Sequence, residues 1–488
     1  MDKKHPLTTR TVTTLRPAPV FWTATALFIA ANALLSYVSL SIPQTLWVIF
    51  VGFLLPLFFL ILTPYPSTAE NPLKAEKLPV IPRWIWAGTI LLAVLLRFYH
   101  LDSLSAWPTV DEGVHAYFSA DLSRHWNGRL LVSASQFPAS YCWGQSLLFK
   151  WLSPSLFSLW LYPALWSTAC LGIVGTAARR FFSASTAFFL LFFMAFGFWP
   201  LYLGRLSILG GYSLCVEIAA LALLASYLEA PPAKRSIQLF TLTVLSGLGF
   251  YTYFTWPLVA ALLGFSLLGK SGLRVRDKLR DFFLFGFGNL FFLLPLARVF
   301  YGKNRGYFQH VWVGSHPTVF FHNLSLTQSY LRQLFWGQPH TTLCMGAVWG
   351  GLFNPIVAAL SFIGLVVLLK KPKNPSTLFF GAALFLFFSP AFLTTNLEMT
   401  RLSAILPIVL LIAAGGLQFL LGLLPRPWRG PALLLVLLPS LALDLTQFLA
   451  VYPNHWQAHP EIYGPFKSKE YSRAYAVLKK KAAIDGPA

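Results

Sequence analysis

Residues 84–122 read WIWAGTILLAVLLRFYHLDSLSAWPTVDEGVHAYFSADL. An apolar run over 84–99 is followed by Pro108, which breaks the chain, and then by two adjacent carboxylates, Asp111 and Glu112. The chain has only 16 acidic residues among 488, and 56% of its residues are hydrophobic. An acidic pair directly behind a long apolar run is therefore unusual in this sequence and calls for an explanation.

The composition is that of a membrane protein. The mean hydropathy is +0.62 and 11% of the residues are charged, whereas soluble proteins carry about 25% charged residues. Apolar runs of about 20 residues, enough to cross a bilayer as a helix, recur along the chain. The formal net charge is +21, but the Lys and Arg residues lie in short loops between the runs, as topology signals do. Some of them suit anionic lipid headgroups, and no nucleic-acid partner is expected.

The apolar runs predict an all-α, polytopic membrane protein of about 13 transmembrane helices. They cover residues 21–40, 44–62, 84–99, 155–177, 184–200, 211–228, 238–252, 255–268, 282–299, 354–369, 377–393, 402–422 and 431–450. We expect one transmembrane module over residues 1–450 and a short tail over 451–488.

The basic residues predict the orientation of these helices. If the N-terminus lies in the cytoplasm, every inside loop carries at least two Lys or Arg residues, as the positive-inside rule requires. Two long loops, about 100–154 and 300–353, then lie outside together with the C-terminal tail. The basic residues of the inside loops are Lys74, Lys77, Arg83, Arg179, Arg180, Lys234, Arg235, Lys270, Arg274, Arg276, Lys278, Arg280, Lys370, Lys371, Lys373, Arg426 and Arg429.

The acidic pair opens a predicted amphipathic helix in the first outside loop. Its apolar face would lie along the outer membrane surface, with Asp111 at the helix N-terminus near the ends of the membrane helices. This face consists of Val114, Tyr117, Phe118, Leu122 and Trp126. One interpretation makes Asp111 an N-cap and Glu112 a partner of the helix dipole. Another places the pair in a polar pocket between helix ends, and both interpretations can hold together.

Three further charged residues stand out, two at helix ends and one within a helix. Arg205, in FWPLYLGRLSILGG, lies at an outside turn, and Arg401, in TTNLEMTRLSAILP, begins the twelfth run. Glu217 falls inside the sixth run, where an ionisable residue indicates a functional site or an ion pair. Each arginine is an interfacial anchor, a partner in a salt bridge such as Arg205 with Glu217, or a phosphate ligand. Arginine binds phosphate bidentately, and a carboxylate such as Asp111 accepts a proton from a hydroxyl.

No cofactor is expected to be required. A hard cation takes about six oxygen ligands, and the outside loops hold few carboxylates, whereas arginine alone neutralises a single phosphate. A divalent metal remains an alternative, because Asp111 and His115 are spaced i, i+4 on one helix face. Other histidines of the outside loops, His316, His322 and His340, could complete such a site.

Four segments resemble a known family when they are taken in order. They are RFYHLDSLSAWPTVDEGVHAYFSADL at 97–122, LYLGRLSILGGYSL at 201–214, TRLSAILPIVLLIAAGGL at 400–417 and the tail NHWQAHPEIYGPFKSKEYSRAYAVLKKK at 454–481. Together they resemble the GT-C glycosyltransferases, in the branch that holds protein O-mannosyltransferases and the lipid A aminoarabinose transferase. The resemblance covers most of residues 84–480.

The resemblance implies a transferase that moves a sugar, a hexose or a pentose, from a polyprenyl-phosphate donor on the outer face of a bacterial inner membrane. By position, Asp111 would be the catalytic base and Glu112 a supporting carboxylate. Arg205 and Arg401 would contact the donor phosphate or the sugar. The acceptor would be a hydroxyl of a lipid, a glycan or a protein. A single displacement at the anomeric carbon would invert its configuration.

The chain departs from the family pattern at one place. The aminoarabinose branch has a basic residue in a Lys-Pro-Pro context late in the first loop, where this chain reads FPASYCWGQSLLFKWL. Lys150 lies too far along the chain to match that residue.

Two alternative functions remain open. A secondary transporter would show two related halves with charges at the membrane midplane. An O-antigen ligase or polymerase would depend on basic residues of its long loop. The candidates there are Arg298, Arg305, His310 and Arg332.

The two long outside loops each contain one cysteine, Cys142 and Cys344. If these loops face an oxidising compartment, a disulfide between them would clamp both loops over the site. Cys170 and Cys215 fall within predicted membrane helices and are expected to be reduced core residues.

Overall fold

The computed structural model describes residues 17–38, 40–63, 81–102, 104, 108–126, 131–132, 137–301, 318–337, 350–372, 374–393 and 398–458. Within these ranges the chain is helical, apart from a short antiparallel ladder between β1 (Leu131–Val132) and β2 (Phe137–Pro138). The predicted all-α fold is confirmed. The predicted tail falls largely outside the described residues, although its first part continues the last long helix as far as Ala458.

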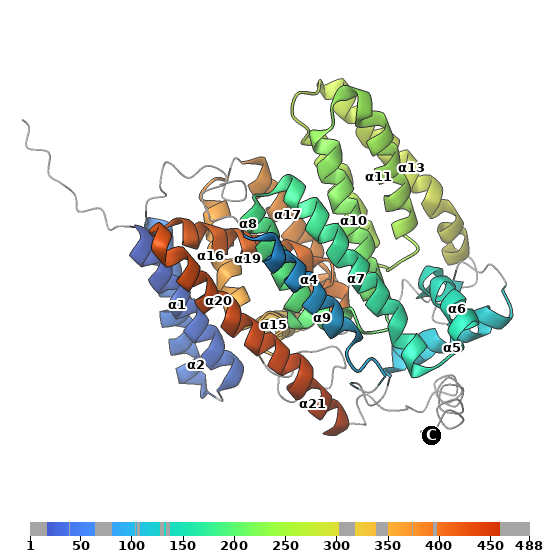
Figure 1. Cartoon of the computed structure of the whole chain (residues 1–488). Coiled ribbons are helices and arrows are strands. Elements are labelled where there is room, and N and C mark those ends of the chain that lie inside the picture. Colours follow the sequence, from blue (N-terminus) through green and yellow to red (C-terminus); the bar gives the residue numbers. More distant parts are fainter. Residues whose placement is uncertain are drawn as a thin grey trace, which may run out of the picture.

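Every one of the predicted apolar runs coincides with one helix or with two or three consecutive helical elements (Figure 1). The elements before residue 200 are α1 (Pro17–Tyr37), α2 (Ile42–Ile49), η1 (Phe50–Leu54), α3 (Leu55–Leu62), α4 (Arg83–Phe98), α5 (Val110–Arg124), α6 (Ser140–Leu152), α7 (Leu156–Phe181), α8 (Ala184–Phe196) and α9 (Phe198–Leu203). The next are α10 (Leu209–Glu229), α11 (Pro232–Gly249), α12 (Trp256–Leu268), α13 (Val275–Tyr301) and α15 (Thr318–Phe335). The last are α16 (Pro355–Leu369), α17 (Pro375–Phe388), α18 (Pro390–Leu393), η2 (Met399–Leu402), α19 (Ile405–Gly422), α20 (Arg426–Thr446), η3 (Gln447–Val451) and α21 (Tyr452–Ala458).

Among the described residues, 8 helices are long and apolar enough to cross a membrane, and three shorter apolar helices, α8, α12 and α16, join them. The chain is an integral membrane protein, but the predicted number of 13 crossings is not confirmed. One reason is that some runs are interrupted. Gly197, for example, separates α8 from α9 within a single apolar run.

Local sequence explains several helix starts. Asn354 caps α16 by accepting hydrogen bonds from the amides of Ile356 and Val357, both at 3.0 Å. Pro355 occupies the first helical position, where no amide hydrogen is needed. Asn374 and Pro375 repeat the pattern at the start of α17. Such caps satisfy backbone donors that would otherwise be left without partners at the helix end.

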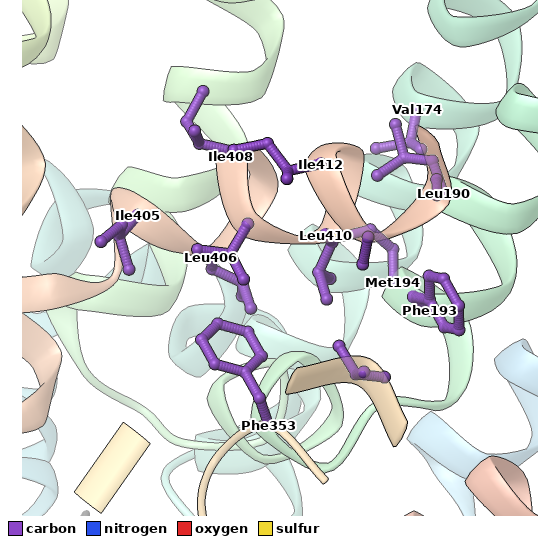
Figure 2. Close-up of a cluster of buried hydrophobic side chains, with 14 of the residues drawn as sticks. Val174, Leu190, Phe193, Met194, Phe353, Ile405, Leu406, Ile408, Leu410 and Ile412 are labelled. Atoms are coloured by element: carbon purple, nitrogen blue, oxygen red, sulfur yellow. The ribbon is translucent and has the colours of Figure 1, made fainter. Parts of the chain in front are cut away.

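Helix α19 forms the centre of the hydrophobic core. It is buried along nearly its whole length, and Figure 2 shows its side chains Leu406 and Leu410 beside Phe353, Phe193 and Met194 from other elements. Its contact with α16 depends on glycine. A Cβ atom at Gly364 would lie 2.1 Å from the carbonyl oxygen of Ile412, and one at Gly416 would lie 2.2 Å from that of Leu360. The two backbones therefore approach as closely as small residues allow, which is typical of membrane helix pairs.

This close approach makes Gly416→Ala a test of the core. The added methyl group would collide with the Leu360 carbonyl and force α16 and α19 apart, at a cost of about 1–3 kcal/mol of stability. We expect a clearly lower melting temperature for the detergent-purified variant, measured by intrinsic fluorescence. Gly422→Ala is the matched control, because a Cβ at the end of the same helix meets nothing within 4 Å. Equal melting temperatures for the two variants would contradict the packing described.

Candidate functional site

The helix that carries the acidic pair, α5, begins two residues earlier than an N-cap at Asp111 would require. Thr109 is the N-cap: its hydroxyl accepts the Glu112 amide hydrogen at 3.3 Å, and its own amide donates to Oε2 of Glu112 at 2.8 Å. This is a capping box. The prediction that Asp111 caps the helix is therefore wrong. Asp111 lies in the first turn, where its charge still suits the helix dipole.

The side chain of Glu112 is completely buried and ties α5 to two other parts of the chain. Its Oε1 accepts a hydrogen bond from Nε1 of Trp160 on α7 and another from the backbone amide of Ser207, both at 2.8 Å. Burial raises the pKa of Glu112, and these donors, with Thr109, oppose that rise. Glu112 is thus a buried structural carboxylate that joins α5, α7 and the 204–208 loop.

Ser207 is held through all of its polar groups. Besides the amide bonded to Glu112, its carbonyl accepts from Nδ1 of His115 at 2.9 Å. Its hydroxyl is hydrogen-bonded to Tyr141 at 2.9 Å and to Nε2 of Gln145 at 2.8 Å. All of these side chains are buried. The network fixes the 204–208 loop between α5 and α6.

The network also determines which face of α5 is buried in the protein. This face includes Glu112, His115 and Ser119, and groups of α6, α7 and the 204–208 loop satisfy these side chains. Of the predicted apolar face, only Leu122 is buried, whereas Trp126, just beyond the helix, is 61% exposed. Contact of this face with the membrane surface stays a prediction.

Asp111 points differently from its neighbour. It is half-buried, and the surrounding protein, followed by the charges of Glu398 and Glu112, raises its pKa to about 7. The guanidinium of Arg401 lowers the pKa of Asp111. Asp111 and Arg401, predicted together as site residues, therefore lie within electrostatic range of each other. A carboxylate with a pKa near neutrality that keeps access to solvent is suited to proton transfer.

Glu398 joins the site and was not among the predicted site residues. Its Oε2 lies 3.2 Å from Nη2 of Arg401, and its Oε1 accepts from the hydroxyl of Thr400 at 2.5 Å. The Arg401 guanidinium also lies over the ring of Phe254, 5.8 Å from its centre. The i, i+3 spacing of Glu398 and Arg401 is the signal in the sequence that could have indicated the pair.

Arg205 is bonded to the backbone at the end of another helix. Its guanidinium donates to the carbonyls of Tyr99 at 2.5 Å and His100 at 2.8 Å, just beyond the end of α4. Burial lowers the pKa of Arg205 to about 10, although the charge of Asp102 acts to raise it. These backbone contacts agree with the anchor interpretation of Arg205, and a role in phosphate binding stays a prediction. Glu217 is buried within α10 and forms no ion pair with it in the described structure.

The structure bears on the metal and disulfide alternatives only in part. No group of three His, Cys, Asp or Glu side chains suited to a metal ion occurs among the described residues. Cys142 is a free, buried thiol. The remaining candidates of these two alternatives lie outside the described positions or have undescribed side chains: His316, His322, His340 and Cys344. Arg305 and His310 of the second long loop are likewise outside the description.

Comparison with known proteins reveals the fold. No protein-family model and no curated protein sequence matches the chain. Among solved structures it is similar to ArnT from Cupriavidus metallidurans bound to undecaprenyl phosphate, with a TM-score of 0.53, 16% identity and coverage of 83% of this chain and 81% of that one. The apo structure of the same protein gives a TM-score of 0.52, 15% identity and 78% coverage of both chains. ArnT, the lipid A aminoarabinose transferase, is a GT-C glycosyltransferase, so the chain has the predicted GT-C fold.

The buried bonds of Glu112 predict a stability defect for Glu112→Gln. An amide can replace one carboxylate oxygen but presents an NH₂ group to the other donors, which leaves buried groups unbonded and costs about 1–3 kcal/mol. We expect a lower melting temperature and faster proteolysis of the loop around α5. Asp121→Asn, an exposed change on the same helix with a side chain 49% exposed, should leave both unchanged. A Glu112→Gln protein as stable as that control would contradict the structural role.

Proposed function

We propose that this protein is a membrane glycosyltransferase that moves a sugar from a polyprenyl-phosphate donor to an acceptor hydroxyl, with Asp111 as the general base. The observation that carries the proposal is the half-buried Asp111 carboxylate, with a pKa near 7, within range of the Arg401 guanidinium. The GT-C fold supports it, because ArnT with this fold was solved with undecaprenyl phosphate bound. The acceptor belongs to a lipid, a glycan or a protein.

The reaction is a single displacement. Asp111 takes the proton of the acceptor hydroxyl as its oxygen attacks the anomeric carbon. The bond from that carbon to the donor phosphate oxygen breaks, and the electron pair leaves with the lipid phosphate. Arg401 stabilises the charge that develops on the phosphate. Attack opposite to the leaving group inverts the anomeric configuration.

The other predicted site residues act by positioning. Glu112 fixes α5 so that Asp111 faces the acceptor, and Arg205 holds the end of α4 beside the 204–208 loop. We therefore assign the donor phosphate to Arg401 and not to Arg205. Because an arginine neutralises a phosphate without help, no step of this reaction is assigned to a metal ion.

The proposed site faces the outside of the membrane, with the N-terminus in the cytoplasm of a bacterial cell. The supporting argument is that Asp111, Ser207, Phe254 and Arg401 all come from segments that the positive-inside rule assigns to the outside. The basic residues Arg235 and Arg280, assigned to the inside, pair with Asp281 in a separate cluster.

Asp111→Asn tests the assignment of the base. Thr109 remains as the cap, so the helix and the expression level should be unchanged. The amide cannot accept the proton, and loss of a general base costs roughly 10²–10⁴-fold in rate. We would measure transfer of radiolabelled mannose, glucose and aminoarabinose from polyprenyl-phosphate donors, with Asp121→Asn as the control. If Asp111→Asn keeps most of its transfer activity, Asp111 is not the base. Substrate counterflow by the wild type, without transfer, would favour a transporter.

The pKa of Asp111 predicts a dependence on pH. A base works when deprotonated, so kcat/KM should rise with pH and level off above about 7. The carboxylate of Glu398 is one of the charges that raise this pKa. Glu398→Gln should therefore move the midpoint of the pH profile to a lower pH. An unchanged midpoint, or one at higher pH, would show that Glu398 does not act on the titrating group.

A further inference from the structure

We infer that Glu398 occupies the place on Arg401 that the donor phosphate takes, so that this carboxylate competes with the phosphate and is displaced when the donor binds. The inference rests on the proposed function, which assigns the phosphate to Arg401. It gives Glu398 the role of a displaceable counter-ion, a role distinct from that of the base.

The two partners of the ion pair differ in how firmly they are held. The side chain of Arg401 is 9% exposed, whereas that of Glu398 is 35% exposed. The guanidinium also lies against the ring of Phe254. The carboxylate is therefore the partner that can leave, and the guanidinium is the fixed element that remains.

The backbone of Glu398 is anchored independently of its side chain. The Glu398 amide donates to the hydroxyl of Tyr330 at 3.0 Å, and that hydroxyl donates to the Glu398 carbonyl at 3.3 Å. Tyr330 is completely buried. The carboxylate can thus rotate toward solvent about its own side-chain bonds while η2 and Arg401 stay in place.

Displacement of the carboxylate also releases a hydrogen-bond donor. The hydroxyl of Thr400, which donates to Oε1 of Glu398, lies next to Arg401 in the chain and is hydrogen-bonded to the hydroxyl of Tyr253 at 3.0 Å. A phosphate oxygen that replaces Oε1 can accept this hydroxyl, and another can accept Nη2 of Arg401. The two groups that bind the carboxylate are therefore suited to bind a phosphate in its place.

The balance of charge requires such a displacement. Asp111, Glu398 and Arg401 already lie within electrostatic range of one another, so a phosphate that arrived while Glu398 stayed would stand among like charges. Like charges in contact at a binding site are strongly unfavourable. When the lipid phosphate leaves, the Glu398 carboxylate can return to Arg401.

The test measures binding and does not depend on sugar transfer. The affinity of the purified full-length protein for farnesyl phosphate, a short polyprenyl monophosphate, would be compared with that of Glu398→Gln by thermophoresis. We expect Glu398→Gln to bind about fivefold to tenfold more tightly, as loss of a half-exposed competing ion pair allows. Glu229→Gln, which changes an exposed carboxylate at the far end of α10, is the matched control and should bind like the wild type.

A double-mutant cycle separates displacement from simple repulsion. If Glu398 competes for Arg401, the Glu398→Gln substitution does not raise the affinity for farnesyl phosphate when Arg401 is already changed to Gln. A gain that persists there, or an unchanged or weaker affinity in the single variant, would overturn the inference. The inference would also be overturned if, in a parallel measurement, Glu398→Gln bound inorganic phosphate more tightly but not farnesyl phosphate. Failure of wild-type sugar transfer together with an Arg401-dependent gain would refute the proposed function alone.

Discussion

The hydrogen bond from the Ser207 amide to the Glu112 carboxylate is the contact on which the geometry of the site depends. A buried carboxylate is costly unless several donors satisfy it, and here Ser207, Trp160 and Thr109 do so. Because consecutive helix residues point about 100° apart, fixing Glu112 toward the core turns Asp111 away from it. This explains why two carboxylates stand side by side: one holds the helix, and the other is left with access to solvent.

Two buried arginines satisfy backbone carbonyls at the ends of helices near the site. Arg97 of α4 donates to the carbonyls of Met194 and Ala195 at the end of α8, both at 3.0 Å. Arg205, which follows α9, donates in turn to carbonyls at the end of α4. The last carbonyls of a helix lack partners within it, and within a membrane protein they must be satisfied internally. Arg97 thus satisfies the end of α8, next to the break at Gly197, and Arg205 satisfies the end of α4.

The clusters at the two ends of the bundle differ in their balance of charge. Asp281 is buried and accepts from Tyr227 at 2.7 Å and from Arg235 and Arg280 at 3.1 and 2.9 Å, so its carboxylate is fully engaged. Asp111 and Glu398, by contrast, share the field of Arg401 and both keep access to solvent. The first arrangement stabilises a closed structure, whereas the second leaves a charged group able to exchange partners with a ligand.

The sequence by itself determined the membrane class and the positions of the helices, and it marked the segments around Asp111 and Arg401 as candidates for the site, because apolar length and charge placement are local properties. Tertiary structure decided which way the side chains face. Periodicity predicted an apolar face of α5, but it could not show that the polar groups of Ser207, 92 positions from His115, hold the polar face of this helix in the protein. Likewise, Arg205 and Arg401 look alike as arginines at helix ends. Only folding shows that one lies against the carbonyls of α4 and the other beside two carboxylates, because the partners of a charge are fixed by contacts between segments far apart in the chain.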